Sequence, residues 1–339
     1  MSRSELVIYT VLEVIIAIAC CLGNLLVIWA VWSSRVLRKT TFCFVVSLAV
    51  ADFLVGALVV PLAVLIERGV QTRFYTCLFI SCVVIVLTQA SVHSLLAIAV
   101  DRFLRVHNPL RYRGAIKKQN LLAAVTVCWV SASFLGFIPL FGWHNKDPTT
   151  NVNSTLTCEF LAVIPLSYLV NFVFFICILP PTVVMFALYL YIFVTISKQL
   201  RKGIGQAAES TTFLQRERRL ASSLALVLVL FAICWFPLYI MNSLSYFHPN
   251  LKMPAVAFHI GVLLVHGNSA VNPIVYAFKV PKIKTAYKSI LIKLTGWKQN
   301  VDQNSQNLDK TVSSSNTNIK YKVKNVQTPK MVLTISQEL

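Results

Sequence analysis

The chain is 339 residues long, and 57% of these are hydrophobic while 13% are charged. An ordinary soluble domain carries about 25% charged residues, so this composition excludes a soluble globular protein and indicates a chain that crosses a lipid bilayer several times. The formal net charge of +19 is explained by the placement of the basic residues between the apolar segments. Nucleic acid is therefore not expected as a partner.

Seven apolar segments can be counted along the chain, and each is near or above the roughly 20 residues that a membrane helix needs. They are Val7–Trp32, Phe42–Ile66, Phe74–Val106, Asn120–Phe141, Ile164–Ile196, Leu220–Tyr246 and Ala255–Phe278. No small-residue cleavage site follows a short apolar core, so we expect the first segment to be retained. The sequence predicts an all-α membrane protein, with an extracellular N-terminus over 1–6 and a seven-helix transmembrane domain over 7–278.

Connections rich in basic residues alternate along the chain with connections that contain few of them. The connections after the first, third and fifth segments, and the stretch after the seventh, are rich in Lys and Arg. The other connections hold far fewer, namely Arg3, Arg68, Arg73, Lys146 and Lys252. Short loops with excess positive charge stay in the cytoplasm, so we expect a multi-pass plasma-membrane protein with its N-terminus outside and its C-terminus inside. The glycosylation sequon that begins at Asn153 falls on the predicted outer side, which agrees.

The part that follows the seventh segment changes composition twice. Over 279–297 we expect an amphipathic eighth helix on the inner leaflet, because Lys alternates with apolar residues there. The remaining residues, 298–339, are rich in Asn, Gln, Ser, Thr and Lys, which predicts a disordered cytoplasmic tail. Phosphorylation of the Ser and Thr residues and an unmodified tail fit this composition equally well.

The chain has nine cysteines, and most of them lie inside apolar segments, where cysteine serves as a small hydrophobic residue. Cys77 and Cys158 differ, because both fall at segment ends on the predicted outer face. An oxidising exterior favours a disulfide between them. The spacing of the cysteines and histidines matches no zinc-binding pattern.

Polar residues inside a membrane are costly and usually mark a function. Asp52, in the second segment, is the most costly of these, because a lone carboxylate at mid-depth needs a cation, a proton or hydrogen-bond donors. One interpretation is a protonated carboxyl group that only joins helices. The other is a cluster of sodium and water held by Asp52, Ser91, Asn268 and Asn272 beneath Trp235.

The third segment ends at the predicted inner face in a charged pair, Asp101-Arg102. Taken alone, this pair fits an interfacial pair whose side chains reach toward the headgroups. Pro181, Pro237 and Pro273 each remove a helix hydrogen bond and predict kinks in the fifth, sixth and seventh segments. Each feature is weak by itself, but their order on seven helices is specific.

In this order the motifs resemble those of the rhodopsin-like (class A) G-protein-coupled receptors, from Val7 to Leu294. The matching residues are Gly23-Asn24, Leu48–Asp52, Cys77 with Cys158, Asp101-Arg102-Phe103, Trp129, Pro181 with Tyr189, Cys234–Pro237 and Asn272–Tyr276. Phe103 stands where the family usually has a tyrosine, which leaves the neighbouring arginine in place. The resemblance implies a seven-helix bundle that admits a heterotrimeric G protein from the cytoplasmic side.

The resemblance also implies a conformational switch at the cytoplasmic end. Arg102 would rest against Asp101 and Glu217 when the receptor is off, and would be freed when the sixth helix swings outward. Tyr189 and Tyr276 would belong to the same switch. Receptor kinases and arrestin would act on the tail.

Within this class the chain is most similar to the adenosine receptors. An opsin needs a lysine where His266 stands, and an amine receptor needs an aspartate where Val84 stands. The stretches shared with adenosine receptors are 87–89, 94–102, 104–106, 141–143, 158–160, 235–242, 266–269 and 272–277. Leu161 is typical of the type 3 subtype, while the stretches at 158–160 and 266–270 look more like type 1. Both subtypes couple mainly to inhibitory Gi/Go proteins, so the resemblance implies inhibition of adenylate cyclase.

The resemblance implies a nucleoside site in the extracellular half of the bundle. Its residues would be Phe160, Asn242, His266, Thr88, Leu238, Trp235, Glu13, Tyr239 and Val265. An Asn side chain can form two hydrogen bonds with adenine, and Phe160 can stack on a purine for about 1–3 kcal/mol. His266, held by Glu13, and Thr88 would contact the ribose hydroxyls. Taken alone, Asn242 also fits a helix-end cap, and Phe160 fits ordinary loop packing.

Two residues depart from the adenosine-receptor pattern. Val265 stands where a Ser or Thr usually contacts the ribose, and a lost hydrogen bond to a buried hydroxyl costs about 1–3 kcal/mol. Tyr239 stands where the family has His or Ser. A receptor on the same scaffold whose ligand has shifted to another purine or small molecule is therefore the alternative. A transporter would show internal repeats, and an enzyme would show a catalytic constellation; the sequence has neither, and no cofactor beyond an allosteric sodium ion is expected.

Overall fold

The computed structural model describes most of the chain up to residue 295. The described residues are 3–33, 41–109, 112, 118–146, 155–202, 208–251, 253–279 and 281–295. The predicted sequon at Asn153 and the predicted tail over 298–339 lie outside them. The chain divides into two units, Met1–Tyr287 and Lys288–Leu339, and the helices that carry the site belong to the first.

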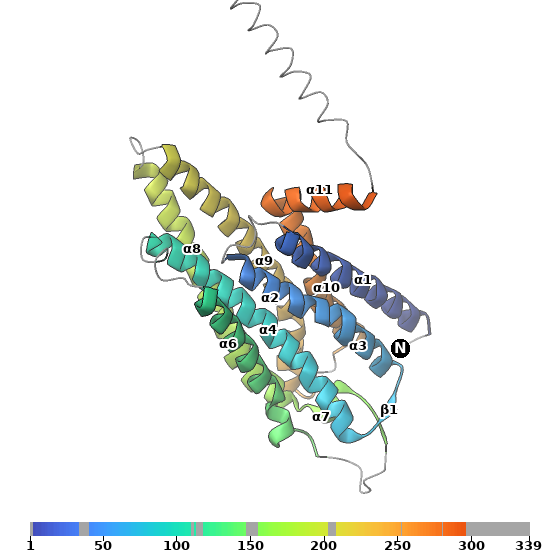
Figure 1. Ribbon diagram of the computed structural model, residues 1–339. Helices are drawn as coiled ribbons and strands as arrows, with labels where there is room; N and C mark the ends of the chain where they lie inside the picture. Colours follow the sequence, from blue (N-terminus) through green and yellow to red (C-terminus); the bar gives the residue numbers. More distant parts are fainter. Residues whose placement is uncertain are drawn as a thin grey trace, which may run out of the picture. The chain divides into compact units, whose positions relative to one another are not determined.

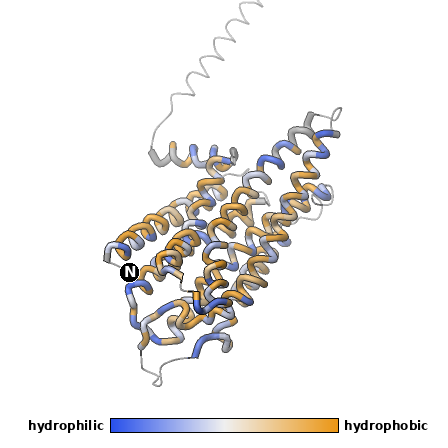
Figure 2. Tube along the Cα trace, turned by 180° about the vertical axis from the view of Figure 1, so that it is seen from behind, coloured by the Kyte–Doolittle hydropathy of each residue, from blue (hydrophilic) through white to orange (hydrophobic). Residues whose placement is uncertain are grey.

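Seven helical segments of the described chain are long and apolar enough to cross a membrane, as the sequence predicts. In chain order the helices are α1 (Arg3–Ser33), α2 (Thr41–Leu54), η1 (Val55–Val59), α3 (Val60–Glu67), α4 (Phe74–His107), α6 (Lys118–Phe137), η2 (Ile138–Phe141), α7 (Phe160–Val163), η3 (Tyr168–Ile178), α8 (Leu179–Lys202), α9 (Ala208–Phe247), α10 (Ala255–Lys279) and α11 (Pro281–Thr295). Figure 2 shows hydrophobic residues along most of each long helix. Many of these side chains are exposed, because they face lipid and not water.

The fifth span starts at Tyr168, four residues later than the sequence predicts. The residue at the predicted start, Ile164, has an extended backbone, because the following Pro165 disfavours the helical conformation of its neighbour. Further along, the π-helix η3 ends at Ile178 and α8 begins, with Pro181 in its first turn. Proline cannot donate a backbone hydrogen bond. Thr182 donates its hydroxyl to the Ile178 carbonyl at 2.7 Å and so satisfies an oxygen at this break.

Helix α4 is the centre of the first unit, where it contacts α2, α6, α8 and α9 (Figure 1). Most of its length is buried, including the small polar residues Thr88 and Ser91 in its middle and the charged pair near its C-terminal end. A buried central helix that carries polar groups at two depths places both groups against several neighbouring helices. It therefore connects the two halves of the bundle.

The N-terminal end of α4 is bonded to the loop before α7. Cys77 and Cys158 form a disulfide with their Cα atoms 5.6 Å apart, which confirms the predicted pair. The short strands β1 (Gln71–Thr72) and β2 (Leu156–Thr157) pair antiparallel beside it. Gly69, with φ of 75°, turns the chain from α3 toward β1 in a conformation that favours glycine. These constraints fix the loop two residues before Phe160.

Candidate functional site

The predicted ligand residues come from five helices of the first unit. They are Glu13 on α1, Thr88 on α4, Phe160 on α7, Trp235, Leu238, Tyr239 and Asn242 on α9, and Val265 and His266 on α10. Phe160 and Leu238 are partly buried and pack against the main buried cluster of the protein. The other seven residues are buried. Helix α10 contacts α1 and α9, and α4 contacts α7 and α9, so these contacts link the five helices.

Glu13 and His266 form a buried pair across α1 and α10. The Nδ1 atom of His266 lies 2.9 Å from both carboxylate oxygens of Glu13. Glu13 is fully buried, so this contact holds the orientation of the ring. A neutral histidine in this position keeps its proton on Nδ1, toward the carboxylate, and leaves Nε2 as an acceptor for a ligand hydroxyl.

Asn242 is a buried amide inside α9, five residues before the helix ends at Phe247. A cap residue lies at a helix end, so the alternative role of Asn242 as a helix cap is wrong. Its side chain has no hydrogen bond to another residue that the structure describes. Leu238 lies one turn earlier, at i−4, and therefore on the same face. An amide that no described residue engages can bond to a ligand that offers both a donor and an acceptor.

Tyr239 packs against other aromatic rings. Its ring stacks on Phe174 of η3, with centroids 5.1 Å apart and planes at 6°. It also stacks on Trp235, with centroids 6.0 Å apart, and Trp235 in turn contacts Phe231 one turn earlier in α9. The bulk of Tyr239 is thus accommodated against the fifth span. The residue forms a flat aromatic wall at a position where the resemblance leads us to expect His or Ser.

Asp52 receives three hydrogen bonds from two helices. Ser91 of α4 and Ser269 of α10 donate to Oδ1 at 3.5 and 2.9 Å, and Asn272 donates to Oδ2 at 2.7 Å. The predicted partner Asn268 is buried in the same region, but the donor from its stretch of α10 is Ser269. Positions 268 and 269 both lie about one helical turn from position 272, so the spacing alone does not distinguish them.

The groups around Asp52 fit a hydrated cation. Three donors directed at both oxygens stabilise the ionised carboxylate. Asn24 of α1 donates to the Ser269 carbonyl at 3.0 Å, while its own Oδ1 atom is buried and has no partner among the described residues. A buried oxygen without a donor is satisfied by water or a cation. The residues present therefore suit the predicted sodium-binding role, and the same three hydrogen bonds also permit a carboxyl group that only joins helices.

Near the C-terminal end of α4, Arg102 is held by two acidic residues. Its guanidinium lies 2.5 Å from Asp101 and 3.3 Å from Glu217 of α9. Arg102 is among the most deeply buried side chains of the protein. This is the closed arrangement that the resemblance implies for the off state. Tyr189 and Tyr276, the other predicted members of the switch, are also buried.

Tyr112, in the connection after α4, is a member of this cluster that the sequence analysis missed. Its hydroxyl donates to Asp101 at 2.5 Å and accepts from Arg105 at 2.6 Å. Burial raises the pKa of the Tyr112 hydroxyl, and the bond to Asp101 adds to this effect, so the group stays protonated and keeps donating. No sequence motif singles out a tyrosine in a connection. The contact depends on how the connection folds back on α4.

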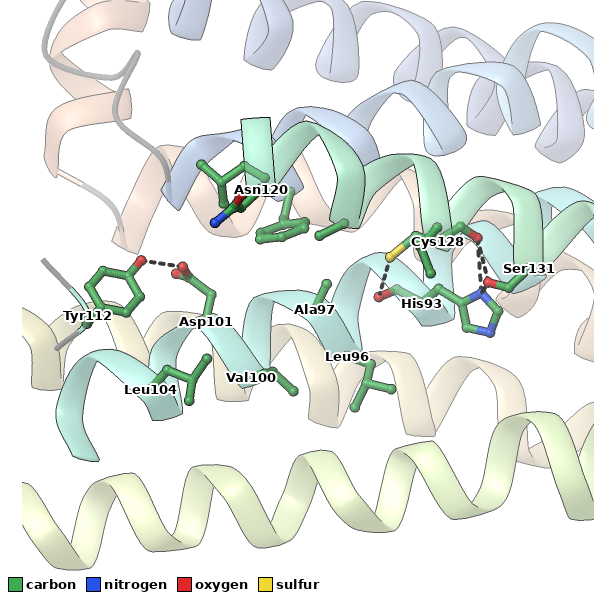
Figure 3. Close-up of a pocket in the computed structure, with 14 residues that line it drawn as sticks. His93, Leu96, Ala97, Val100, Asp101, Leu104, Tyr112, Asn120, Cys128 and Ser131 are labelled. Atoms are coloured by element: carbon green, nitrogen blue, oxygen red, sulfur yellow. Dashed lines mark hydrogen bonds between the residues drawn. The ribbon is translucent and has the colours of Figure 1, made fainter. Parts of the chain in front are cut away.

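The Asp101–Tyr112 bond borders a groove between α4 and α6 with a volume of about 440 Å³ (Figure 3). Apolar side chains line most of this groove. At its far end, the ring of His93 lies 3.0 Å from the Ser131 hydroxyl and 3.2 Å from the Cys128 carbonyl. These bonds join the middle of α4 to α6, and they explain how a histidine is accommodated inside a membrane span.

Comparison with known proteins agrees with this geometry. Residues 23–276 match the family described as 7 transmembrane receptor (rhodopsin family). The chain is 45% identical to adenosine receptor A3 of Ovis aries over 286 residues, which is 84% of this chain and 90% of that protein. It is 44% identical to the A3 receptor of Canis lupus familiaris over 283 residues (83% and 90%). The A3 receptor of Bos taurus is 44% identical over 286 residues (84% and 90%).

These relatives are of type 3, one of the two subtypes that the sequence indicates, and the matched region contains all seven spans except the outer part of the first and the end of the seventh. Members of this family are receptors and not enzymes. The chain therefore belongs to the rhodopsin family of seven-transmembrane receptors and, within it, to the adenosine receptors.

Proposed function

We propose that this protein is a plasma-membrane receptor for adenosine that acts through inhibitory Gi/Go proteins to lower adenylate cyclase activity. The observation that carries the proposal is the buried Asn242 amide, which has no partner in the described chain and lies on the helix packed against α10. The relatives named above are adenosine receptors. The N-terminus would be extracellular, which the Cys77–Cys158 disulfide supports, because disulfides persist on the oxidising side of the membrane.

Each part of the nucleoside would meet a suitable group. Asn242 would donate to N7 of the adenine and accept from its N6 amine, and Phe160 would stack on the ring. The Nε2 atom of His266 would accept from a ribose hydroxyl, because Glu13 occupies the other ring nitrogen. Thr88 would supply a further hydroxyl to the sugar. Trp235 and Leu238 would form the apolar floor beneath it.

Val265 is the residue that most affects how well adenosine is bound. It is buried next to His266 and offers no polar atom to the ribose. Restoring a hydroxyl with Val265→Thr is expected to increase adenosine potency about tenfold, since one buried hydrogen bond contributes about 1–3 kcal/mol. Dose–response curves for cAMP inhibition in cells that express either form measure this directly.

The same experiment distinguishes the two ligand hypotheses. Inhibition of cAMP by the wild-type receptor supports adenosine as its ligand. A response from Val265→Thr alone would mean that the natural ligand is another purine or small molecule, which the Tyr239 stack also favours. No response from either form at confirmed surface expression would reject adenosine. Val262→Thr, one turn away on the same helix, is a matched control and should not change potency.

We also propose that the Arg102 cluster restrains the receptor in the absence of ligand. Glu217→Gln removes one of the two charges that hold Arg102 and is expected to raise basal inhibition of cAMP about fivefold or more, since couplings of this kind are about 1–3 kcal/mol. Arg218→Gln, at the exposed neighbouring position, is the control. Equal basal activity in Glu217→Gln and wild type would contradict the restraint.

Two further partners complete the proposal. A sodium ion at Asp52, Ser91 and Asn272, with Asn268 and Ser269 nearby, would favour the off state. Receptor kinases and arrestin would act on the tail, whose residues lie outside those that the structure describes.

A further inference from the structure

Glu67 and His259 form a hydrogen-bonded pair between α3 and α10. Glu67 is the last residue of α3, and His259 lies in the second turn of α10. The Nε2 atom of His259 is 2.9 Å from a carboxylate oxygen of Glu67, and the side chains are 20% and 35% exposed. The pair is thus in contact with the extracellular solution. Neither residue belongs to the motifs that carry the family resemblance.

The pair connects to the proposed ligand site through α1. The ring of Tyr9 packs edge-on against His259, with centroids 5.1 Å apart. The Tyr9 side chain is also hydrogen-bonded to Glu13, which holds His266. His259 lies seven residues, or two helical turns, outward from His266 on α10 and therefore on the same face. A continuous set of contacts leads from the outer surface to the ring that would touch the ribose.

Each ring nitrogen of His259 faces a hydrogen-bond acceptor. Its Nδ1 atom lies 2.7 Å from the Ala255 carbonyl, which can only accept, and its Nε2 atom faces the Glu67 carboxylate. A neutral histidine has one donor and one acceptor, so it satisfies only one of these contacts. Both are made when the ring is positively charged. Histidine gains and loses this proton between about pH 5 and pH 8.

We propose that Glu67 and His259 are positioning residues of the ligand site, and that their contact closes at acidic extracellular pH and opens as the pH rises. The groups that face His259 are Glu67 from α3 and Tyr9 from α1, with Glu13 behind Tyr9. The closed pair joins α3 to α10 and holds Tyr9 against His259. Through Glu13 it keeps His266 oriented, so an agonist leaves more slowly at low pH.

The first test needs no ligand. Thermal unfolding of the full-length receptor in lipid nanodiscs is measured for wild type, Glu67→Gln and His259→Asn. The measurement is made at about pH 6 and at about pH 8, because histidine titrates within this range. We expect the midpoint temperature of thermal unfolding to be several degrees higher for wild type than for both variants at the lower pH. The difference should disappear at the higher pH. The stabilisation belongs to the charged ring, so it is present in acid and lost as the pH rises.

Two further variants keep this test independent of general folding defects. The double substitution Glu67→His with His259→Glu exchanges the partners and should restore the pH-dependent stabilisation. His248→Asn removes an exposed histidine just after α9 and should leave the wild-type profile unchanged. Identical pH profiles for wild type and Glu67→Gln would overturn the proposal.

The second test rests on the proposed function, because adenosine is the probe. Dissociation of labelled adenosine from wild type is expected to slow severalfold when the pH falls from about 8 to about 6. In Glu67→Gln, which keeps the Glu13–His266 contact, we expect a smaller change in the dissociation rate. A rate that changes equally in both forms would refute a positioning role. If the first test shows the expected pH-dependent stabilisation but adenosine does not bind at either pH, the proposed ligand is wrong and the pH-sensitive contact is still supported.

Discussion

Replacement of Asn242 by Ala is expected to abolish the response to adenosine at concentrations that saturate the wild-type receptor. The side chain is buried and makes no hydrogen bond to the described chain, so its polar atoms are available to the purine. Loss of a bidentate contact with adenine costs about 1–3 kcal/mol, and the adenine edge left without a partner in a buried site adds a similar amount. Together these terms predict a loss of potency of a hundredfold or more in a cAMP assay.

The variant should still fold and reach the cell surface, because the lost side chain satisfies no other group of the described protein. Ser243→Ala is the matched control at the next position. Its hydroxyl bonds only to the Tyr239 carbonyl within the described chain, one turn back in the same helix, so adenosine potency should stay within a few-fold of wild type. Unchanged potency in Asn242→Ala, with surface expression confirmed, would remove this residue from the adenine site.

The fold could be predicted well from the sequence, because hydropathy and charge act locally. Seven spans follow from apolar runs. The fifth starts four residues later than predicted, because of Pro165 and its effect on Ile164, and it ends five residues later, at Arg201. The disulfide between Cys77 and Cys158 follows from their places at segment ends. Such features need no knowledge of which helices are neighbours.

The candidate site was predicted where a family motif marks it and missed where only packing does. The Glu13–His266 contact joins residues 253 positions apart, and the sequence indicates it through resemblance alone. Ser269 was missed because it lies beside an equally plausible Asn268. Tyr112 and the Glu67–His259 pair were missed because no periodicity relates a connection, or the ends of two distant helices, to each other. The contacts of Glu13 with His266 and of Glu67 with His259 exist only once α1, α3 and α10 are packed together.

The residues around Asp52 predict a large effect of sodium on agonist binding. Asp52→Asn is expected to remove the sensitivity of agonist binding to sodium, because an amide has no charge to hold the cation. In wild type, replacing potassium by sodium at about 0.15 M ionic strength should weaken agonist binding about fivefold or more, the lower end of a typical coupling between two sites. The variant should bind agonist equally in both salts.

Ser269→Ala separates the cation from the hydrogen bonds that surround it. This change removes one of three donors to Asp52 but keeps the negative charge, so we expect a smaller sodium effect and not its loss. Potassium chloride at equal concentration controls for ionic strength, since screening is the same for both salts. A sodium effect of wild-type size in Asp52→Asn would place the ion elsewhere. The carboxylate would then serve to join α2, α4 and α10, which is the structural role that its three hydrogen bonds also permit.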